Sequence, residues 1–204
     1  MKLKRSDYFE AIEKSLANAK ELIEEAEILA EKNKIARAYT LFQFSIEEIG
    51  KALLTFTFIL KGDIESDEET KKFLKKFTSH LEKTEFSQGI DFMFAIMAEK
   101  SDLTKKLLEN SFSELGKVHI SNNYKNYSLY TSLIENKFHK PSEIITKEKL
   151  ENISYYAKLR LQIAEPFIRL GIQNFDILYE TRNDLDEEAT SIECSKKIKE
   201  IIES

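Results

Sequence analysis

The sequence predicts an all-α protein, and three observations support that fold class. The 204 residues include only 5 glycines and 2 prolines, whereas sheet proteins with many turns need more of both. Apolar residues recur every three or four positions in most segments, which is the period of one helix face. The length suffices for one sizeable core and not comfortably for two. We therefore predict a single helical-bundle domain over residues 1–204.

An N-terminal helix is predicted from a capping signature followed by a long amphipathic repeat. Ser6 and Asp7, with Glu10 three residues after Asp7, are typical of a helix N-terminus. Apolar residues then keep a helical period as far as about Lys32. The polar residues 32–34 leave room only for a short turn, so we expect an antiparallel hairpin with the helix that follows.

The segment from Arg37 to Leu60 is the most apolar part of the chain, and we predict that it forms a long central helix. Apolar residues cover one face at helical spacing and also occur on the opposite side, at Phe44, Leu54 and Phe58. A helix that is apolar most of the way round is buried among others. Because the rest of the chain offers little obvious cover, we also expect a homodimer. Gly62 is expected to end this helix.

A third helix is predicted over residues 66–83, opened by a capping box of Ser66 and Glu69. On a helical wheel centred on Phe77, His80 lies at the edge of the apolar face. Three lysines continue round the same side: Lys72, Lys76 and Lys83. Such a stripe is either a solvated face or the cationic side of a site that includes His80.

The following segments give weaker signals. Residues 89–98 are apolar and are expected to pack in the bundle, and Ser101 is expected to cap a short helix to about Asn110. Residues 111–128 have the weakest periodicity, so we predict a long loop there. Residues 129–134 fit either a helical turn or a strand.

The C-terminal third is predicted to be helical. Thr146 is expected to cap a long helix that reaches about Leu178. Pro166 should kink this helix or begin a second segment. Residues 185–204 are highly charged with an apolar edge, which predicts a peripheral C-terminal helix.

Composition restricts the environment and the chemistry. Cys194 is the single cysteine, so no internal disulfide can form, and the longest uncharged apolar run spans only residues 52–60. The N-terminus also has no apolar run of signal-peptide length, so we expect a cytoplasmic protein. A bilayer needs roughly 20 apolar residues, so no membrane segment is expected. The net charge of −5 disfavours indiscriminate nucleic-acid binding but is compatible with a local basic face. The sequence has no glycine-rich phosphate loop or metal-binding histidine motif, and no cofactor or metal is expected.

Three charged residues interrupt the central helix: Glu47, Glu48 and Lys51. Buried charges are costly unless they are paired, so these residues need a reason. One interpretation is an ordinary pair of Glu47 with Lys51, four residues later, while Glu48 faces solvent. The other is a narrow polar stripe of Arg37, Glu48, Lys51 and Thr55 that forms part of a site. The residue types leave both interpretations open.

These segments resemble the HEPN superfamily of small helical proteins and, within it, the AbiV family of bacterial abortive-infection proteins. The matching stretches are ARAYTLFQFSIEEIGKALL at 36–54, KKFTSHLEK at 75–83, KNYSLYTS at 125–132, and the region of Pro141 and ITKEKL. With the first helix, the resemblance covers about residues 10–170. It implies a HEPN-like bundle with additional C-terminal helices, and a role in phage defence.

The resemblance also implies an activity: a toxin that shuts down translation by cutting RNA without a metal, often at a homodimer interface. In such a reaction a ribose 2′-hydroxyl attacks the adjacent phosphate. His80 would exchange the proton, and Lys76 or Lys83 would stabilise the extra phosphate charge. Glu47 or Glu48 would orient His80.

Many HEPN nucleases carry an arginine, then four to six residues, and then the histidine, and no arginine precedes any histidine at that distance in this chain. Lys75 stands five residues before His80 and Lys76 four, so lysine would take the cationic role. The candidate catalytic residues are His80, Lys76, Lys83, Glu47, Glu48 and Lys51.

A second function class is a non-catalytic protein that blocks infection by binding a phage or host translation component. Tyr124, Tyr127 and Tyr130 would serve such binding, although aromatic residues are also routine packing residues. One bundle can host either role, so the sequence leaves enzyme and binding protein open. The expected partners are a second copy of the chain, RNA as substrate, and a phage-encoded activator protein; no membrane partner is expected.

Overall fold

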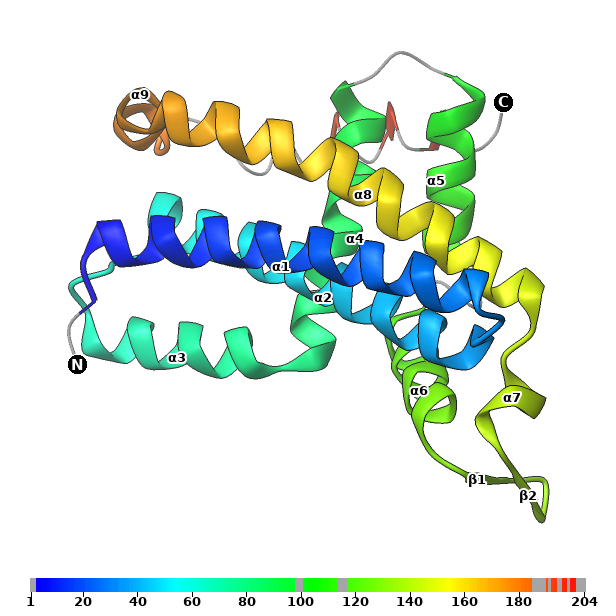
Figure 1. The fold of residues 1–204 in the computed structure, drawn as a ribbon. Helices are drawn as coiled ribbons and strands as arrows, with labels where there is room; N and C mark the ends of the chain where they lie inside the picture. Colours follow the sequence, from blue (N-terminus) through cyan, green and yellow to red (C-terminus); the bar gives the residue numbers. More distant parts are fainter. Residues whose placement is uncertain are drawn as a thin grey trace.

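The computed structural model describes residues 3–97, 101–113 and 117–184, together with 190, 192–193, 196–197 and 199–200. Helices dominate these ranges (Figure 1), which confirms the all-α prediction. The elements in chain order are α1 (Arg5–Glu31), α2 (Ile35–Lys61), α3 (Asp67–Thr78), α4 (His80–Met97), α5 (Asp102–Phe112), α6 (Val118–Leu129), β1 (Ser132–Ile134), β2 (Lys137–His139), α7 (Pro141–Ile144), α8 (Lys147–Gln173) and α9 (Phe175–Thr181). Cys194 and most of the predicted 185–204 helix lie outside the described residues.

α1 and α2 form the expected antiparallel hairpin. Asn33 lies in the turn with a φ of 58°, a left-handed conformation that asparagine tolerates better than most residues. The start of α1 differs from the prediction, because the helix begins at Arg5. Asp7 occupies the third helical position, where its carboxylate accepts the backbone N–H of Lys4 at 2.7 Å.

α2 lies at the centre of the bundle. It contacts α1, α4, α6 and α8, and Figure 1 shows α1, α2 and α8 running alongside one another while α4 crosses them. Helices of the same chain already bury Phe42, Ile49 and Ile59. α2 therefore needs no second chain to cover it, contrary to the prediction, and the homodimer itself stays a prediction.

Gly50 marks a close approach between α2 and α4. A Cβ atom built on Gly50 would lie 1.8 Å from the backbone carbonyl oxygen of Lys83, so any side chain there would force α4 to move. Gly50→Ala is expected to lower the free energy of unfolding by about 1–3 kcal/mol, as overpacking does. Urea denaturation measures this change.

Gly89→Ala is the matched control, because a Cβ atom at Gly89 meets nothing within 4 Å. This substitution should leave stability unchanged or raise it by about 0.5–1 kcal/mol, the gain from replacing glycine inside a helix. Equal effects of the two substitutions would contradict the close approach at Gly50.

The predicted continuous helix over residues 66–83 is wrong. Ser66 caps α3 as expected, with its hydroxyl oxygen accepting a backbone N–H of the first turn. Ser79 then adopts an extended conformation, and its hydroxyl oxygen accepts a backbone N–H of α4 at 3.4 Å. A side-chain bond of this kind is typical of a helix N-cap, so a new helix starts here and α3 does not continue. His80 therefore begins α4, and the helical wheel that placed it beside Lys76 does not apply.

The predicted loop at 111–128 is also wrong, because most of it forms α6. Ser121, Lys125 and Ser128 recur at helical spacing and bond to α2. The contact face of α6 thus includes polar residues. Apolar periodicity is therefore weak in this segment and does not predict the helix.

β1 and β2 pair as an antiparallel hairpin that projects away from the bundle (Figure 1). Residues 132–134 are thus a strand and not a helical turn. Thr146 caps α8 as predicted, accepting the Lys149 backbone N–H at 3.2 Å. Pro166 lies inside α8 without ending it, and the helix stops at Gln173, before the predicted Leu178.

Candidate functional site

A buried carboxylate, Glu47, lies where α2, α4 and α6 meet. Its side chain is 4% exposed and has three cationic or titratable partners. Its Oε2 lies 2.6 Å from Nδ1 of His80 and 3.3 Å from Nζ of Lys83, and its Oε1 accepts from Nζ of Lys125 at 2.7 Å. We call these four residues the Glu47 cluster.

The fold positions each member of the cluster. Glu47 occupies the middle of α2, and Lys125 reaches it from α6. His80 is the first residue of α4, and Lys83 follows one turn later. The absence of a side chain at Gly50 lets the backbone of Lys83 approach α2, which brings its ammonium group to Glu47. The predicted association of a carboxylate with His80 is therefore present, and Glu47 provides it.

The electrostatics of the cluster follow from burial and close opposite charges. Burial alone would raise the pKa of Glu47, but the hydrogen bonds from Lys125 and His80 and their charges outweigh it, so that pKa is lowered. Burial lowers the pKa of Lys83, while attraction to Glu47 opposes this effect. The ammonium groups of Lys83 and Lys125 thus face the single carboxylate of Glu47.

His80 differs from its partners because it is accessible to solvent. Its side chain is 56% exposed, and it lines an open pocket of about 250 Å³ together with Phe44, Lys125 and Tyr130. A carboxylate can only accept hydrogen bonds, so the Nδ1 atom that faces Glu47 carries the hydrogen. In the neutral imidazole, Nε2 is then the acceptor. This arrangement suits a proton acceptor that works at the pocket.

Glu48 and Lys51 form a separate pair with a distance of 2.5 Å. The predicted pair of Glu47 with Lys51 is therefore wrong, because Glu47 bonds to α4 and α6 while Lys51 bonds back along its own helix. Glu48 is also less exposed than predicted, with 15% of its side chain accessible. Lys76 lies apart from both groups: its half-exposed ammonium is 4.0 Å from the carboxylate of Glu82.

A polar layer between α2 and α6 contains the cluster. The contacts along α2 are Thr40 with Ser128 at 2.7 Å, Gln43 with Ser121 at 2.9 Å, and Glu47 with Lys125 at 2.7 Å. Arg37 extends the layer by donating to the carbonyl oxygen of Leu129 at 2.9 Å. It does not join Glu48 and Lys51, so the single polar stripe that was one interpretation of the sequence is divided. Lys125 was absent from the predicted site, although its helical spacing from Ser121 and Ser128 was a usable signal.

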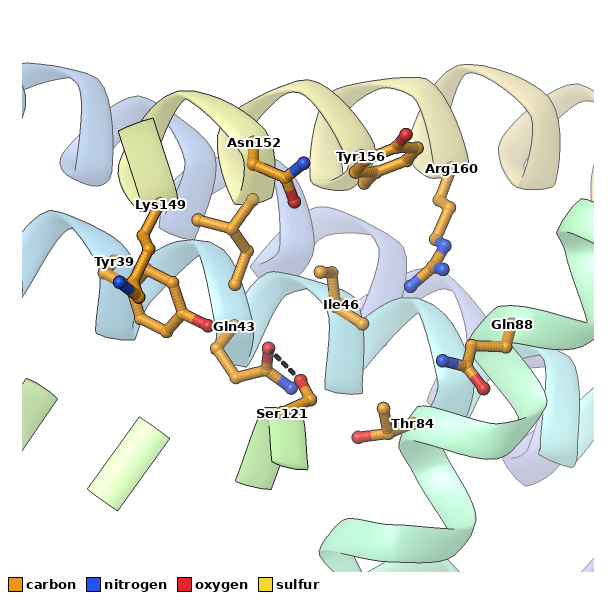
Figure 2. A pocket seen from close by; sticks show the side chains of 11 residues that line it. Tyr39, Gln43, Ile46, Thr84, Gln88, Ser121, Lys149, Asn152, Tyr156 and Arg160 are labelled. Atoms are coloured by element: carbon orange, nitrogen blue, oxygen red, sulfur yellow. Dashed lines mark hydrogen bonds between the residues drawn. The ribbon is translucent and has the colours of Figure 1, made fainter. Parts of the chain in front are cut away.

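A smaller cavity of about 50 Å³ lies between α2, α4, α6 and α8 (Figure 2). Figure 2 shows Gln43 and Arg160 pointing into it from α2 and α8. Arg160 is buried and forms a bidentate pair with Asp91, at 3.0 and 2.6 Å. No site was predicted here from the sequence.

The part of the chain that the structure describes contains neither of two other kinds of site. Within it, no three or more His, Cys, Asp or Glu side chains are grouped so as to hold a metal ion. Nor does any helix in those ranges have both the length and the apolar character needed to span a bilayer.

Glu47 is expected to make stability depend on acid pH. Its pKa in the folded protein lies below the ordinary value of 4.5, so the unfolded state binds the proton first as pH falls. The stabilisation that ionised Glu47 gives the folded state is therefore complete above pH 4.5. It is lost as the pH drops through the pKa that Glu47 has in the folded protein. Urea unfolding of wild type and Glu47→Gln should show a stability difference that shrinks below that pH. A difference that stays constant would contradict the lowered pKa.

The fold and the site together define the class of this protein. It is an all-α bundle with a polar site between its helices, in which a buried charge cluster lies beneath an accessible histidine. A family model described as AbiV, of the HEPN type, matches residues 7–162, a range that contains the whole Glu47 cluster. Since the match covers more than half of the chain, this protein belongs to the AbiV family of HEPN proteins, which confirms the resemblance. Comparisons with curated proteins and with solved structures gave no match. The family supports an abortive-infection role in phage defence.

Proposed function

We propose that this protein is a phage-defence toxin that cleaves RNA at the Glu47 cluster and thereby shuts down translation during infection. The observation that carries the proposal is the 2.6 Å contact between the exposed His80 and the buried Glu47. It holds an imidazole at the edge of an open pocket that Lys125 also lines. Phosphodiester cleavage by general acid–base catalysis needs these two groups, a proton acceptor and a fixed positive charge.

The proposed reaction uses the RNA's own 2′-hydroxyl as nucleophile and needs no metal. Nε2 of His80 takes the hydroxyl proton as the 2′-oxygen bonds to phosphorus, and the bond from phosphorus to the 5′-oxygen breaks. Water gives a proton to the leaving 5′-oxygen, and His80 returns the proton that it took to the solvent. The products are a 2′,3′-cyclic phosphate and a 5′-hydroxyl. Lys125, which also lines the pocket, supplies positive charge close to the negative charge that develops on the phosphate oxygens.

The other charged residues have supporting roles in this proposal. Glu47 is a positioning residue, because it fixes the imidazole and stabilises the imidazolium that forms. Lys83 is buried and balances Glu47 without reaching the pocket. Glu48 and Lys51 support α2 through their own pair. We assign Lys76 no part in the chemical step, because its contacts lie with Glu82.

Lys125→Met is expected to slow RNA cleavage by about 10²-fold or more, as removal of one group that stabilises transition-state charge does. It should also reduce the salt dependence of binding, because a phosphate contact is lost. Purified protein would be incubated with total RNA in EDTA, with and without phage lysate. Lys76→Met makes the same charge change on the exposed α3 and should cleave like wild type.

Melting temperatures are measured beside these rates, and Lys125→Arg, which keeps the charge, should recover part of the activity. A folded Lys125→Met protein that cleaves RNA as fast as wild type would contradict the role of Lys125. Equal losses in Lys125→Met and Lys76→Met would point to a general charge effect.

A homodimer is part of the proposal. Tyr130 lines the His80 pocket and is exposed, and Leu133 and Phe138 are exposed on the hairpin that follows it. A second chain seated on these side chains would cover apolar surface and narrow the pocket. Light scattering at micromolar concentration tests the dimer. We also propose that the protein acts in the cytoplasm, where its proposed RNA substrate is found.

A second candidate is a non-catalytic protein that blocks infection by binding a phage-encoded or translation protein. The β1–β2 hairpin favours it, since Leu133 and Phe138 lie directly opposite each other and are 60% and 78% exposed. Of the three tyrosines expected to bind a partner, Tyr130 is exposed, whereas Tyr124 packs against Tyr39. Binding of this kind requires the hairpin side chains, whereas RNA cleavage requires His80.

A further inference from the structure

The small cavity contains a buried amide group without a partner. Gln43 is 1% exposed, and its side-chain oxygen Oε1 accepts a hydrogen bond from the Ser121 hydroxyl at 2.9 Å. Its amide nitrogen has no hydrogen-bond partner among the described residues. Buried amide groups in native proteins are almost always hydrogen-bonded, because an unpaired donor loses its interactions with water. An occupant of the cavity that accepts hydrogen bonds would satisfy Gln43.

The charged residues that line the cavity are cationic. Lys149 and Arg160 line it, and the described residues that line it include no aspartate or glutamate. Asp91 occupies Nε and Nη2 of Arg160, so this pair leaves Nη1 unused. Figure 2 shows the guanidinium group directed into the cavity and Lys149 reaching toward Tyr39 at the other end. In a chain of net charge −5, this group of donors contrasts with its surroundings.

We propose that this cavity binds a small oxyanion, a carboxylate or phosphate group, through Gln43, Lys149 and Arg160. An ionised oxyanion accepts hydrogen bonds and offers few or none, which matches these donors. The volume of about 50 Å³ exceeds the roughly 10–15 Å³ that one water needs and fits a group of a few atoms. A free anion and the terminal phosphate of a nucleotide share this chemistry.

The site is distinct from the Glu47 cluster but is adjacent to it. Gln43 lies one helical turn before Glu47 on α2, and Ser121 lies one turn before Lys125 on α6. Thr84 also lines the cavity, and its hydroxyl donates to the backbone carbonyl oxygen of His80 at 3.0 Å. Binding at this site is measured without RNA cleavage, so its test does not depend on the proposed catalytic activity.

Calorimetric titration and thermal melting with sodium phosphate, sodium acetate and sodium chloride at constant ionic strength test the proposal. Wild type should bind phosphate or acetate saturably, and Lys149→Gln should weaken that binding about tenfold or more. Lys147→Gln is the matched control, since Lys147 is exposed on the same helix and does not line the cavity. A dinucleotide with and without a 5′-phosphate distinguishes a terminal phosphate from a free anion.

Gln43→Leu removes the unpaired amide while nearly keeping its size. This variant should melt at or above the wild-type temperature without anion and should gain no stability from phosphate or acetate. If this variant does not fold, the anion affinities of Lys149→Gln and Lys147→Gln test the proposal on their own. Absence of saturable binding in wild type, or equal weakening by both lysine substitutions, would overturn the proposal.

Discussion

Glu47→Ala is expected to lower the free energy of unfolding by about 3–5 kcal/mol, because it leaves buried ammonium groups without a counter-charge. The side chains of Lys83 and Lys125 are 6% and 5% exposed, so water can replace little of the lost interaction. Urea denaturation measures the loss.

Glu48→Ala is the matched control on the same helix. Its partner Lys51 is more exposed, at 21%, and can turn toward solvent, so a smaller loss is expected. Replacing Glu47, Lys83 and Lys125 together by methionine should recover most of the stability, because no unpaired charge is left buried. Equal losses in Glu47→Ala and Glu48→Ala would show that the cluster is not the buried charge centre of the bundle.

His80→Ala is expected to abolish phage defence while leaving the fold nearly intact. More than half of its side chain is exposed, so the substitution removes little buried surface, yet it removes the proposed proton carrier. His80→Gln should fail equally, because an amide can hydrogen-bond to Glu47 but cannot transfer a proton. Plaque counts and melting temperatures are compared for each variant.

His139→Ala is the matched control for His80→Ala. Its Nδ1 is 3.9 Å from a carboxylate oxygen of Glu143, outside hydrogen-bond distance, and it lies on β2 and not on the polar layer. Cells that carry this variant should survive infection like those with wild type. If both histidine variants lost protection to the same extent with unchanged melting, the specific role of His80 would be contradicted.

Local signals predicted the parts of the fold that local interactions determine. The α1–α2 hairpin and the caps at Ser66, Ser101 and Thr146 each depend on apolar spacing or on a side chain within one turn. The break at Ser79 was missed because the apolar spacing continues through it, although its hydroxyl starts a new helix. Predictions failed where a short polar residue competed with the periodic pattern.

The site was predicted in part. The resemblance predicted a carboxylate of α2 beside His80. It did not predict Lys125, because α6 presents polar residues to α2 and its sequence predicts a loop. The small cavity gave no local signal: Arg160 and Asp91 are 69 residues apart, and Gln43 lies inside an otherwise apolar helix. Only the packing of four helices brings these groups together.

The most direct test of RNA cleavage at the Glu47 cluster is a count of RNA ends in phage-infected cells that carry wild type or His80→Ala. Sequencing that captures 2′,3′-cyclic phosphates would report the ends that the proposed reaction leaves. The proposal predicts that infection raises these ends in cells with wild type and not in cells with His80→Ala, at equal protein levels. Equal rises in both, or protection by wild type without new cyclic ends, would contradict the catalytic role of His80 and favour the binding function.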